Sequence, residues 1–226
     1  MKKKRVFYSE LAYVIGILLL ALGTAFIEKA NFGMSMIVAP AYLIHLKISE
    51  FWPFFSFGMS VYIFQAMLLC LLALTLRKLK KSYILSFVTA VIYGIVLDLL
   101  ISFVALIPFA RLIWRIVYFA LGLCICTAGI TLLFHTYFPP EAYELVVKEF
   151  AEKLHQPIGR VKTAYDLLSC ALGVALSLIF FGRFVGIGWG TFVCAALNGF
   201  LIGRCGKLFE KLFDFKDGLK LRSVLE

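Results

Sequence analysis

Residues 112–154 read LIWRIVYFALGLCICTAGITLLFHTYFPPEAYELVVKEFAEKL. A long apolar span ends at Phe134, a break follows at Phe138-Pro139-Pro140, and a shorter helical segment runs from Glu141 to Leu154. About 20 apolar residues are enough for a helix to cross a bilayer, whereas about 14 are too few. This stretch therefore predicts one membrane crossing, an interruption, and a short helix that does not cross.

The beginning of the chain has the same order of features. An apolar span from Leu11 to Ile27 is followed by a break at Asn31-Phe32-Gly33 and by a short segment from Met34 to Lys47. Two further apolar spans come after each short segment. Each unit therefore contains three crossings, and an odd number places the second unit upside down relative to the first.

These features predict an all-α polytopic membrane protein with six transmembrane helices, arranged as two inverted three-helix repeats. Each repeat carries a short re-entrant or interfacial helix after its first span, a layout that recurs in secondary transporters. We expect one membrane domain over residues 1–226, with repeat 1 at about 6–107, repeat 2 at about 111–208 and a basic cytoplasmic tail at 209–226. The predicted spans run from Leu11 to Ile27, Phe54 to Leu76, Ser82 to Ile107, Leu112 to Phe134, Val161 to Phe181 and Ile187 to Ile202.

Composition and charge support a membrane location. The chain is 62% hydrophobic and 16% charged, and its mean hydropathy is +0.96, which excludes an ordinary soluble domain. The net charge of +10 gathers in loops on one side of the predicted spans, so both termini are expected in the cytoplasm of a bacterium, at its cytoplasmic membrane. We expect these basic residues to contact anionic lipid headgroups and not nucleic acid.

The two short segments differ in chemistry. Met34 to Lys47 is apolar, whereas Glu141 to Leu154 alternates charged and apolar residues at helical spacing. The second pattern is typical of an amphipathic helix at the cytoplasmic interface, with Glu149 and Lys153 as an i,i+4 pair.

Ionisable residues inside spans are the sharpest functional signals. A carboxylate near the bilayer centre costs about 2.5–3.5 kcal/mol on insertion scales and therefore usually faces a bundle interior or a wet cavity. Asp98 and Asp166 are both expected near the midplane, about 15 and 13 Å from a membrane face at 1.5 Å per residue. Each is a candidate for proton or cation coupling, and a structural role competes with it. Lys162 with Asp166 is also a plain i,i+4 ion-pair candidate.

Three further residues are weaker candidates for transport or ion coupling. Glu28 lies beside Lys29 at a predicted helix end, where a solvated interfacial carboxylate is the alternative. Gln65 and Asn198 are uncharged and mid-span, and interhelical hydrogen bonds are the alternative explanation for them.

Glycines mark the candidate hinge or path-lining positions. Gly33 lies in the first break, and Gly186, Gly188, Gly190 and Thr191 lie between the last two spans. A tight hairpin that lets helices pack closely explains the second group. Exposed backbone groups lining a substrate path, as in the broken helices of transporters, explain it equally well.

No catalytic motif accompanies these residues. The sequence has no G-x-S-x-G, no H-E-x-x-H and no phosphate-binding loop, and its six cysteines form no C-x-x-C. We expect no enzyme activity, no metal site and no cofactor.

The second half resembles a known family. The run VKTAYD at 161–166, Gly173 and the run GIGWGT at 186–191 are similar to motifs of the YczE/YyaS/YitT family of bacterial integral membrane proteins. GIVLD at 94–98 resembles its G-x-x-x-D helix, and FGMS at 32–35 its first break. The resemblance implies a bacterial membrane protein, with transport suggested for the family.

Two functions follow as hypotheses. The first is a secondary transporter or exporter of an unknown small organic solute, coupled to protons or another cation through Asp98 and Asp166. The alternative is a non-transporting partner or regulator that docks another complex through its cytoplasmic face. The sequence leaves open whether the chain forms a homo-oligomer or binds a membrane partner.

Overall fold

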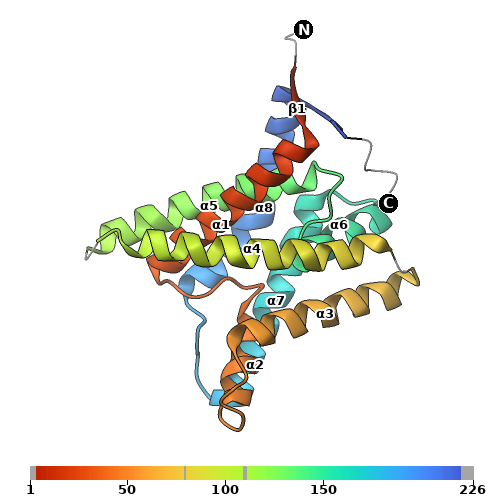
Figure 1. Cartoon of the computed structure of the whole chain (residues 1–226). Coiled ribbons are helices and arrows are strands. Elements are labelled where there is room, and N and C mark those ends of the chain that lie inside the picture. The colour runs from red at the N-terminus through yellow and green to blue at the C-terminus, as the bar shows by residue number, and fades with distance from the viewer. Residues whose placement is uncertain (1–3, 79, 109–110, 220–226) are drawn as a thin grey trace.

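The computed structural model describes residues 4–78, 80–108 and 111–219. Within these ranges the chain forms eight helices and two short strands (Figure 1). In chain order they are β1 (Arg5–Tyr8), α1 (Ser9–Ala30), α2 (Ala39–Ser49), α3 (Phe57–Leu76), α4 (Lys81–Ala105), α5 (Leu112–Phe134), α6 (Ala142–Leu154), α7 (Ile158–Phe181), α8 (Trp189–Leu212) and β2 (Phe213–Lys216).

Six helices are long and apolar enough to cross a membrane, and they correspond to the six predicted spans: α1, α3, α4, α5, α7 and α8. The main differences lie at the ends. The helix predicted from Phe54 begins at Phe57, because the Ser56 hydroxyl accepts a hydrogen bond from the Met59 amide at 3.2 Å and caps it. Large apolar side chains on the outer faces stay exposed, as lipid-facing residues do: Leu74 is 75% and Ile84 is 74% exposed.

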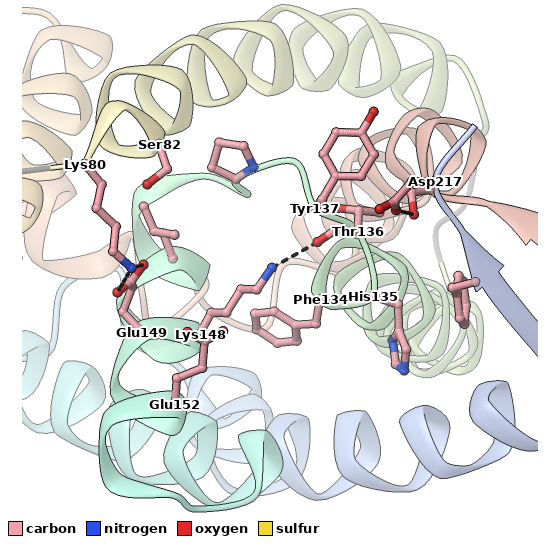
Figure 2. Close-up of a pocket in the computed structure, with 14 residues that line it drawn as sticks. Lys80, Ser82, Phe134, His135, Thr136, Tyr137, Lys148, Glu149, Glu152 and Asp217 are labelled. Atoms are coloured by element: carbon pink, nitrogen blue, oxygen red, sulfur yellow. Dashed lines mark hydrogen bonds and ion pairs between the residues drawn. The ribbon is translucent and has the colours of Figure 1, made fainter. Parts of the chain in front are cut away.

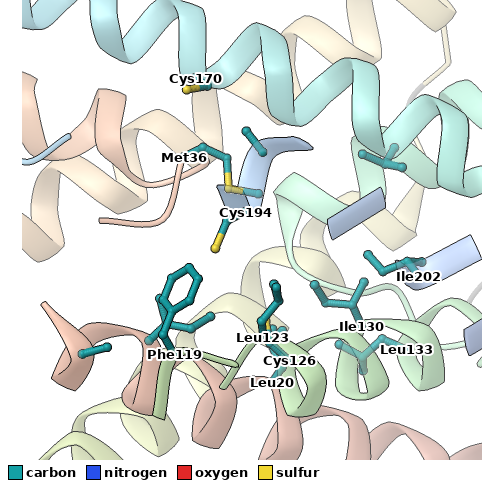
Figure 3. Close-up of a cluster of buried hydrophobic side chains, with 14 of the residues drawn as sticks. Leu20, Met36, Phe119, Leu123, Cys126, Ile130, Leu133, Cys170, Cys194 and Ile202 are labelled. Carbon is teal, nitrogen blue, oxygen red and sulfur yellow. The ribbon is translucent and has the colours of Figure 1, made fainter. Parts of the chain in front are cut away.

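Helices α1 and α5 form the centre of the molecule and pack antiparallel along their length. Glycines allow the close approach. A Cβ on Gly122 would lie 2.7 Å from the Gly23 carbonyl oxygen, and a Cβ on Gly129 would lie 2.8 Å from that of Gly16. Around this contact α1, α5 and α8 bury the main hydrophobic core, which Figure 3 shows between Leu20, Leu133 and Ile202.

The first break has the backbone geometry that its residues predict. Asn31 has φ of 53° and ends α1, and Gly33 has φ of 110°. Both values lie in the left-handed region, which asparagine and glycine tolerate best. The chain therefore turns out of α1 at the predicted position.

The two short helices are present, and each packs against the second long helix of both halves. Helix α2 contacts α3 and α7, while α6 contacts α3 and α7 as well as α4. This arrangement corrects the expectation of an interfacial amphipathic α6, because the helix buries its residues from Ala142 to Val147. The predicted pair of Glu149 with Lys153 does not form. Glu149 binds Lys80 instead, with the shorter N–O distance at 2.6 Å.

The two ends of the chain meet on the same side of the molecule. Strands β1 and β2 pair in parallel, with Arg5 opposite Phe213 and Tyr8 opposite Lys216. We refer to this pair of strands as the terminal ribbon (Figure 1). The region expected to be a basic tail from residue 209 therefore first completes α8 and then forms β2, while residues 220–226 lie outside the described ranges.

Candidate functional site

Three charged side chains meet in the interior where α6 packs against α7. Lys162 Nζ lies 3.1 Å from Glu144 Oε1 and 3.0 Å from Asp166 Oδ1, and all three side chains are completely buried. Asn198 on α8 donates a hydrogen bond from Nδ2 to Asp166 Oδ2 at 3.3 Å. We refer to Glu144, Lys162, Asp166 and Asn198 as the buried cluster.

Local sequence explains how these groups come together. Lys162 and Asp166 are four residues apart on α7 and therefore share one face of the helix. Glu144 lies in the first turn of α6 among apolar neighbours, and the packing of α6 on α7 brings its carboxylate to the lysine. Lys162 also lies 5.6 Å from the ring centroid of Tyr165, a cation–π contact that helps to hold the ammonium group.

A second glutamate adjoins the cluster. Glu141 is the residue just before α6, and its side chain is 3% exposed. Burial and the neighbouring Glu144 carboxylate, to which it hydrogen-bonds, raise the pKa of Glu141 well above its ordinary value, and Lys162 opposes this shift only partly. Glu141 is therefore protonated at neutral pH.

The cluster has more acceptors than donors. With both glutamates ionised, Glu144 Oε2 and Asn198 Oδ1 have no hydrogen-bond partner among the described residues. A proton on Glu141 supplies a donor to Glu144 and removes part of this deficit. Because unpaired buried polar atoms cost free energy, the site favours an additional proton or another cationic or hydrogen-donating group.

The predicted coupling residues fall into separate places. Asp166 and Asn198 belong to the buried cluster. Asp98 is exposed on α4, and its side chain lies close enough to the exposed Glu28 of α1 for the two carboxylates to interact electrostatically. Gln65 is 2% exposed on α3, and its Oε1 finds no hydrogen-bond partner in the described part of the chain.

The predicted hinge residues do come together. Thr191 donates to the Met34 carbonyl oxygen at 2.7 Å, and the Met34 amide donates to the Gly186 carbonyl oxygen at 2.8 Å. Gly33 packs directly on Gly188. The first break and the glycine run before α8 thus form one junction, although they are more than 150 residues apart in the chain.

The sequence reasoning missed Glu141 and Glu144. Both were assigned to the polar face of an interfacial helix, where charged residues are common. One local signal was available: Glu144 stands in the run AYELVV, with apolar residues on either side. That run is too apolar for a solvated helix face, so the carboxylate within it needed a buried partner.

The fold and this site define a class: a polytopic membrane protein that buries an ionic cluster among its helices. The chain belongs to a family of unknown function, DUF6198, whose model matches residues 7–207. No curated protein matches the chain, and no solved structure does.

Proposed function

We propose that this protein is a secondary transporter of a small organic solute in the bacterial cytoplasmic membrane, with both termini in the cytoplasm. The observation that carries the proposal is the buried cluster. Replacing a buried ion pair with apolar residues is often neutral or stabilising. Three completely buried charged side chains in so apolar a chain are therefore better explained by function than by stability.

An inverted-repeat architecture, which many secondary transporters share, is part of the proposal. It is supported by contacts that are related by an offset of 106 residues in the sequence. The offset aligns Gly16 with Gly122 and Gly23 with Gly129, and Gly16 packs on Gly129 as Gly23 packs on Gly122. Such reciprocal contacts are what a two-fold axis produces, as in isologous dimer interfaces.

Aromatic contacts follow the same rule. The offset aligns Tyr13 with Phe119 and Phe32 with Phe138. The ring centroids of Phe32 and Phe119 are 5.8 Å apart, and those of Tyr13 and Phe138 are 4.8 Å apart. Four positions from distant segments thus form two equivalent pairs, which supports a pseudo-two-fold axis between α1 and α5.

The proton is the coupling ion that this site favours. Glu141 holds a proton next to Glu144, and Glu144 shares Lys162 with Asp166. A proton that moves from Glu141 into the cluster would change which carboxylate the lysine pairs with. Such a change in charge pairing between α6 and α7 can couple proton release to a shift in helix packing.

The test is proton flux in proteoliposomes that contain the purified chain. With a pH gradient imposed and a metabolite panel supplied, the wild-type protein should move protons in the presence of one solute class. Asp166→Asn and Glu144→Gln keep the side-chain shapes and should each reduce the coupled flux at least about tenfold, as expected for loss of a required proton-binding group.

The matched control is Asp214→Asn, which neutralises an aspartate in the exposed Lys216–Asp214 pair of β2 and should leave flux unchanged. Wild-type flux in Asp166→Asn and Glu144→Gln would remove the cluster from the mechanism. A protein that carries no flux, shows no ligand-induced thermal shift and co-purifies with a stoichiometric partner would instead favour a non-transporting membrane partner.

A further inference from the structure

Each break in the chain is held against the start of a later helix by a hydroxyl group. At the first junction, formed by residues 31–34 and 186–191, Thr191 donates to the Met34 carbonyl oxygen at 2.7 Å. At the second junction, formed by residues 137–140 and 80–86, Ser86 donates to the Pro140 carbonyl oxygen at 2.6 Å. The offset of 106 residues aligns Met34 with Pro140, so the two junctions are equivalent in position.

The first junction is closed by backbone contacts. The Met34 amide donates to the Gly186 carbonyl oxygen at 2.8 Å, and the Gly190 amide donates to that of Phe32 at 2.9 Å. There is no room for a side chain at Gly188, where a Cβ would lie 2.8 Å from the Phe32 carbonyl carbon and 3.0 Å from the Gly33 amide. The two segments therefore meet without space for a solute.

Arg115 holds this closed junction from the side of α5. Its Nε donates to the Ala30 carbonyl oxygen at 2.8 Å, and its Nη2 donates to that of Asn31 at 2.7 Å. Its guanidinium lies 4.7 Å from the ring centroid of Phe32. One side chain thus fixes the end of α1 and the first residues of the break, using the planar fork that only arginine offers.

The second junction lacks these closing contacts. Pro139 and Pro140 have no amide N–H and cannot make the bond that Met34 makes. The offset aligns Arg115 with Ser9, whose short side chain cannot fill the same space. A cavity of about 620 Å³ opens here instead, next to the terminal ribbon (Figure 2).

The walls of this cavity carry charges of both signs. Lys148 and Glu152 line it from α6, and His135 and Asp217 line it from α5 and the segment after β2. The Ser82 hydroxyl also lines it, and this oxygen is buried without a hydrogen-bond partner among the described residues. A small polar solute with both a cationic and an anionic group fits such walls best.

We propose that the cavity at the second junction is the open solute entrance, on the side of the chain ends, and that the first junction is the closed gate, held shut by Arg115. This inference rests on the proposed transport function and adds to it the direction of access. It also gives Arg115 a role as a positioning residue.

The test uses a membrane-impermeant thiol reagent on vesicles of known orientation. A first background keeps Cys194, which lies in the core one turn after Thr191 and near Met36 (Figure 3), and replaces Cys70, Cys124, Cys126, Cys170 and Cys205 by alanine. Added from the side opposite the chain ends, the reagent should label Cys194 slowly. In Arg115→Gln the rate should rise about tenfold or more, because two charge-assisted hydrogen bonds are lost.

Arg111→Gln is the matched control, since it removes the same charge from an exposed arginine four residues earlier, and it should leave labelling slow. Arg115→Lys keeps the charge without the fork and should give an intermediate rate. It also decides the question if Arg115→Gln fails to fold. In a second background without cysteines, Ser82→Cys should be labelled rapidly from the side of the chain ends.

Protection of Ser82→Cys would overturn the entrance, and equal rates for the Arg115 and Arg111 variants would overturn the gate. Labelling needs no solute and no flux. A failed transport assay with the expected labelling pattern would therefore reject the proposed function alone, whereas flux without that pattern would reject this inference alone.

Discussion

The two halves of the molecule use different chemistry at equivalent helix contacts. In the first half, α3 is tied to α2 by a neutral hydrogen bond from the Ser60 hydroxyl to the Ala41 carbonyl oxygen at 2.6 Å. In the second half, α7 is tied to α6 by the ion pair of Lys162 with Glu144. The offset of 106 residues aligns Ser60 with Asp166. A shared architecture thus carries a plain contact in one half and an ionic site in the other.

Helix packing differs between the halves as well. Helices α7 and α8 are in extensive contact, and glycines bring their backbones together, since a Cβ on Gly159 would lie 2.6 Å from the Gly199 carbonyl oxygen. Helices α3 and α4 barely touch, with Tyr62 and Phe87 as one ring contact at 5.8 Å between centroids. The tightly packed half holds the charges in place, and the loosely packed half leaves room for movement.

The largest effect should come from the ionic side of this comparison. Lys162→Met leaves Glu144 and Asp166 buried without their shared cation and should lower the free energy of unfolding by about 3–5 kcal/mol. Thermal unfolding in detergent measures the loss. The equivalent change in the first half, Ser56→Ala, removes one helix cap and should cost about 1 kcal/mol. Equal losses for the two variants would contradict the difference between the halves.

A smaller effect is expected at the closed junction. Gly188→Ala places a methyl group against the Phe32 carbonyl and should reduce stability by about 1–3 kcal/mol through overpacking. The matched control is Gly58→Ala on α3, where a Cβ would meet only the Ser56 hydroxyl at 3.9 Å. This change should stabilise the helix by up to about 1 kcal/mol. The same thermal measurement compares them, and a harmless Gly188→Ala would mean that the junction is not tightly closed.

The finest distinction is one of pH. The pKa of Glu141 is raised above 4.5 in the folded protein, so between pH 4.5 and that raised value the folded state binds more protons than the unfolded state. Stability should therefore fall as pH rises in this window, by up to about 1.4 kcal/mol per pH unit. Glu141→Gln should flatten this slope, measured as melting temperature from pH 5 to 8. An unchanged slope would assign the pH dependence to another group.

Much of the fold could be predicted from the sequence. The six apolar spans, the left-handed turn at Asn31 and Gly33, and the i,i+4 pair of Lys162 with Asp166 are all found in the structure. These features depend on residues that are near one another in the chain, so hydropathy, backbone preference and helical spacing were sufficient.

The candidate site could be predicted only in part. Asp166 was identified because it stands alone in an apolar span. Glu144 was not, because its environment is set by the packing of α6 against α7. Asp98 was given the same weight as Asp166 from sequence position, yet it lies exposed on α4 beside Glu28. Helical spacing gives the face of a residue relative to its own helix, but not what lies opposite that face.

The sequence by itself determined the crossings, the breaks and the short helices, because each follows from local apolar length and from the conformations open to glycine, asparagine and proline. Only the tertiary structure decided that Glu144 meets Lys162, that Arg115 reaches the end of α1, and that one junction is closed while the other holds a cavity. Those outcomes depend on contacts between segments far apart in the chain, where small differences in side-chain size and charge select among similar packings.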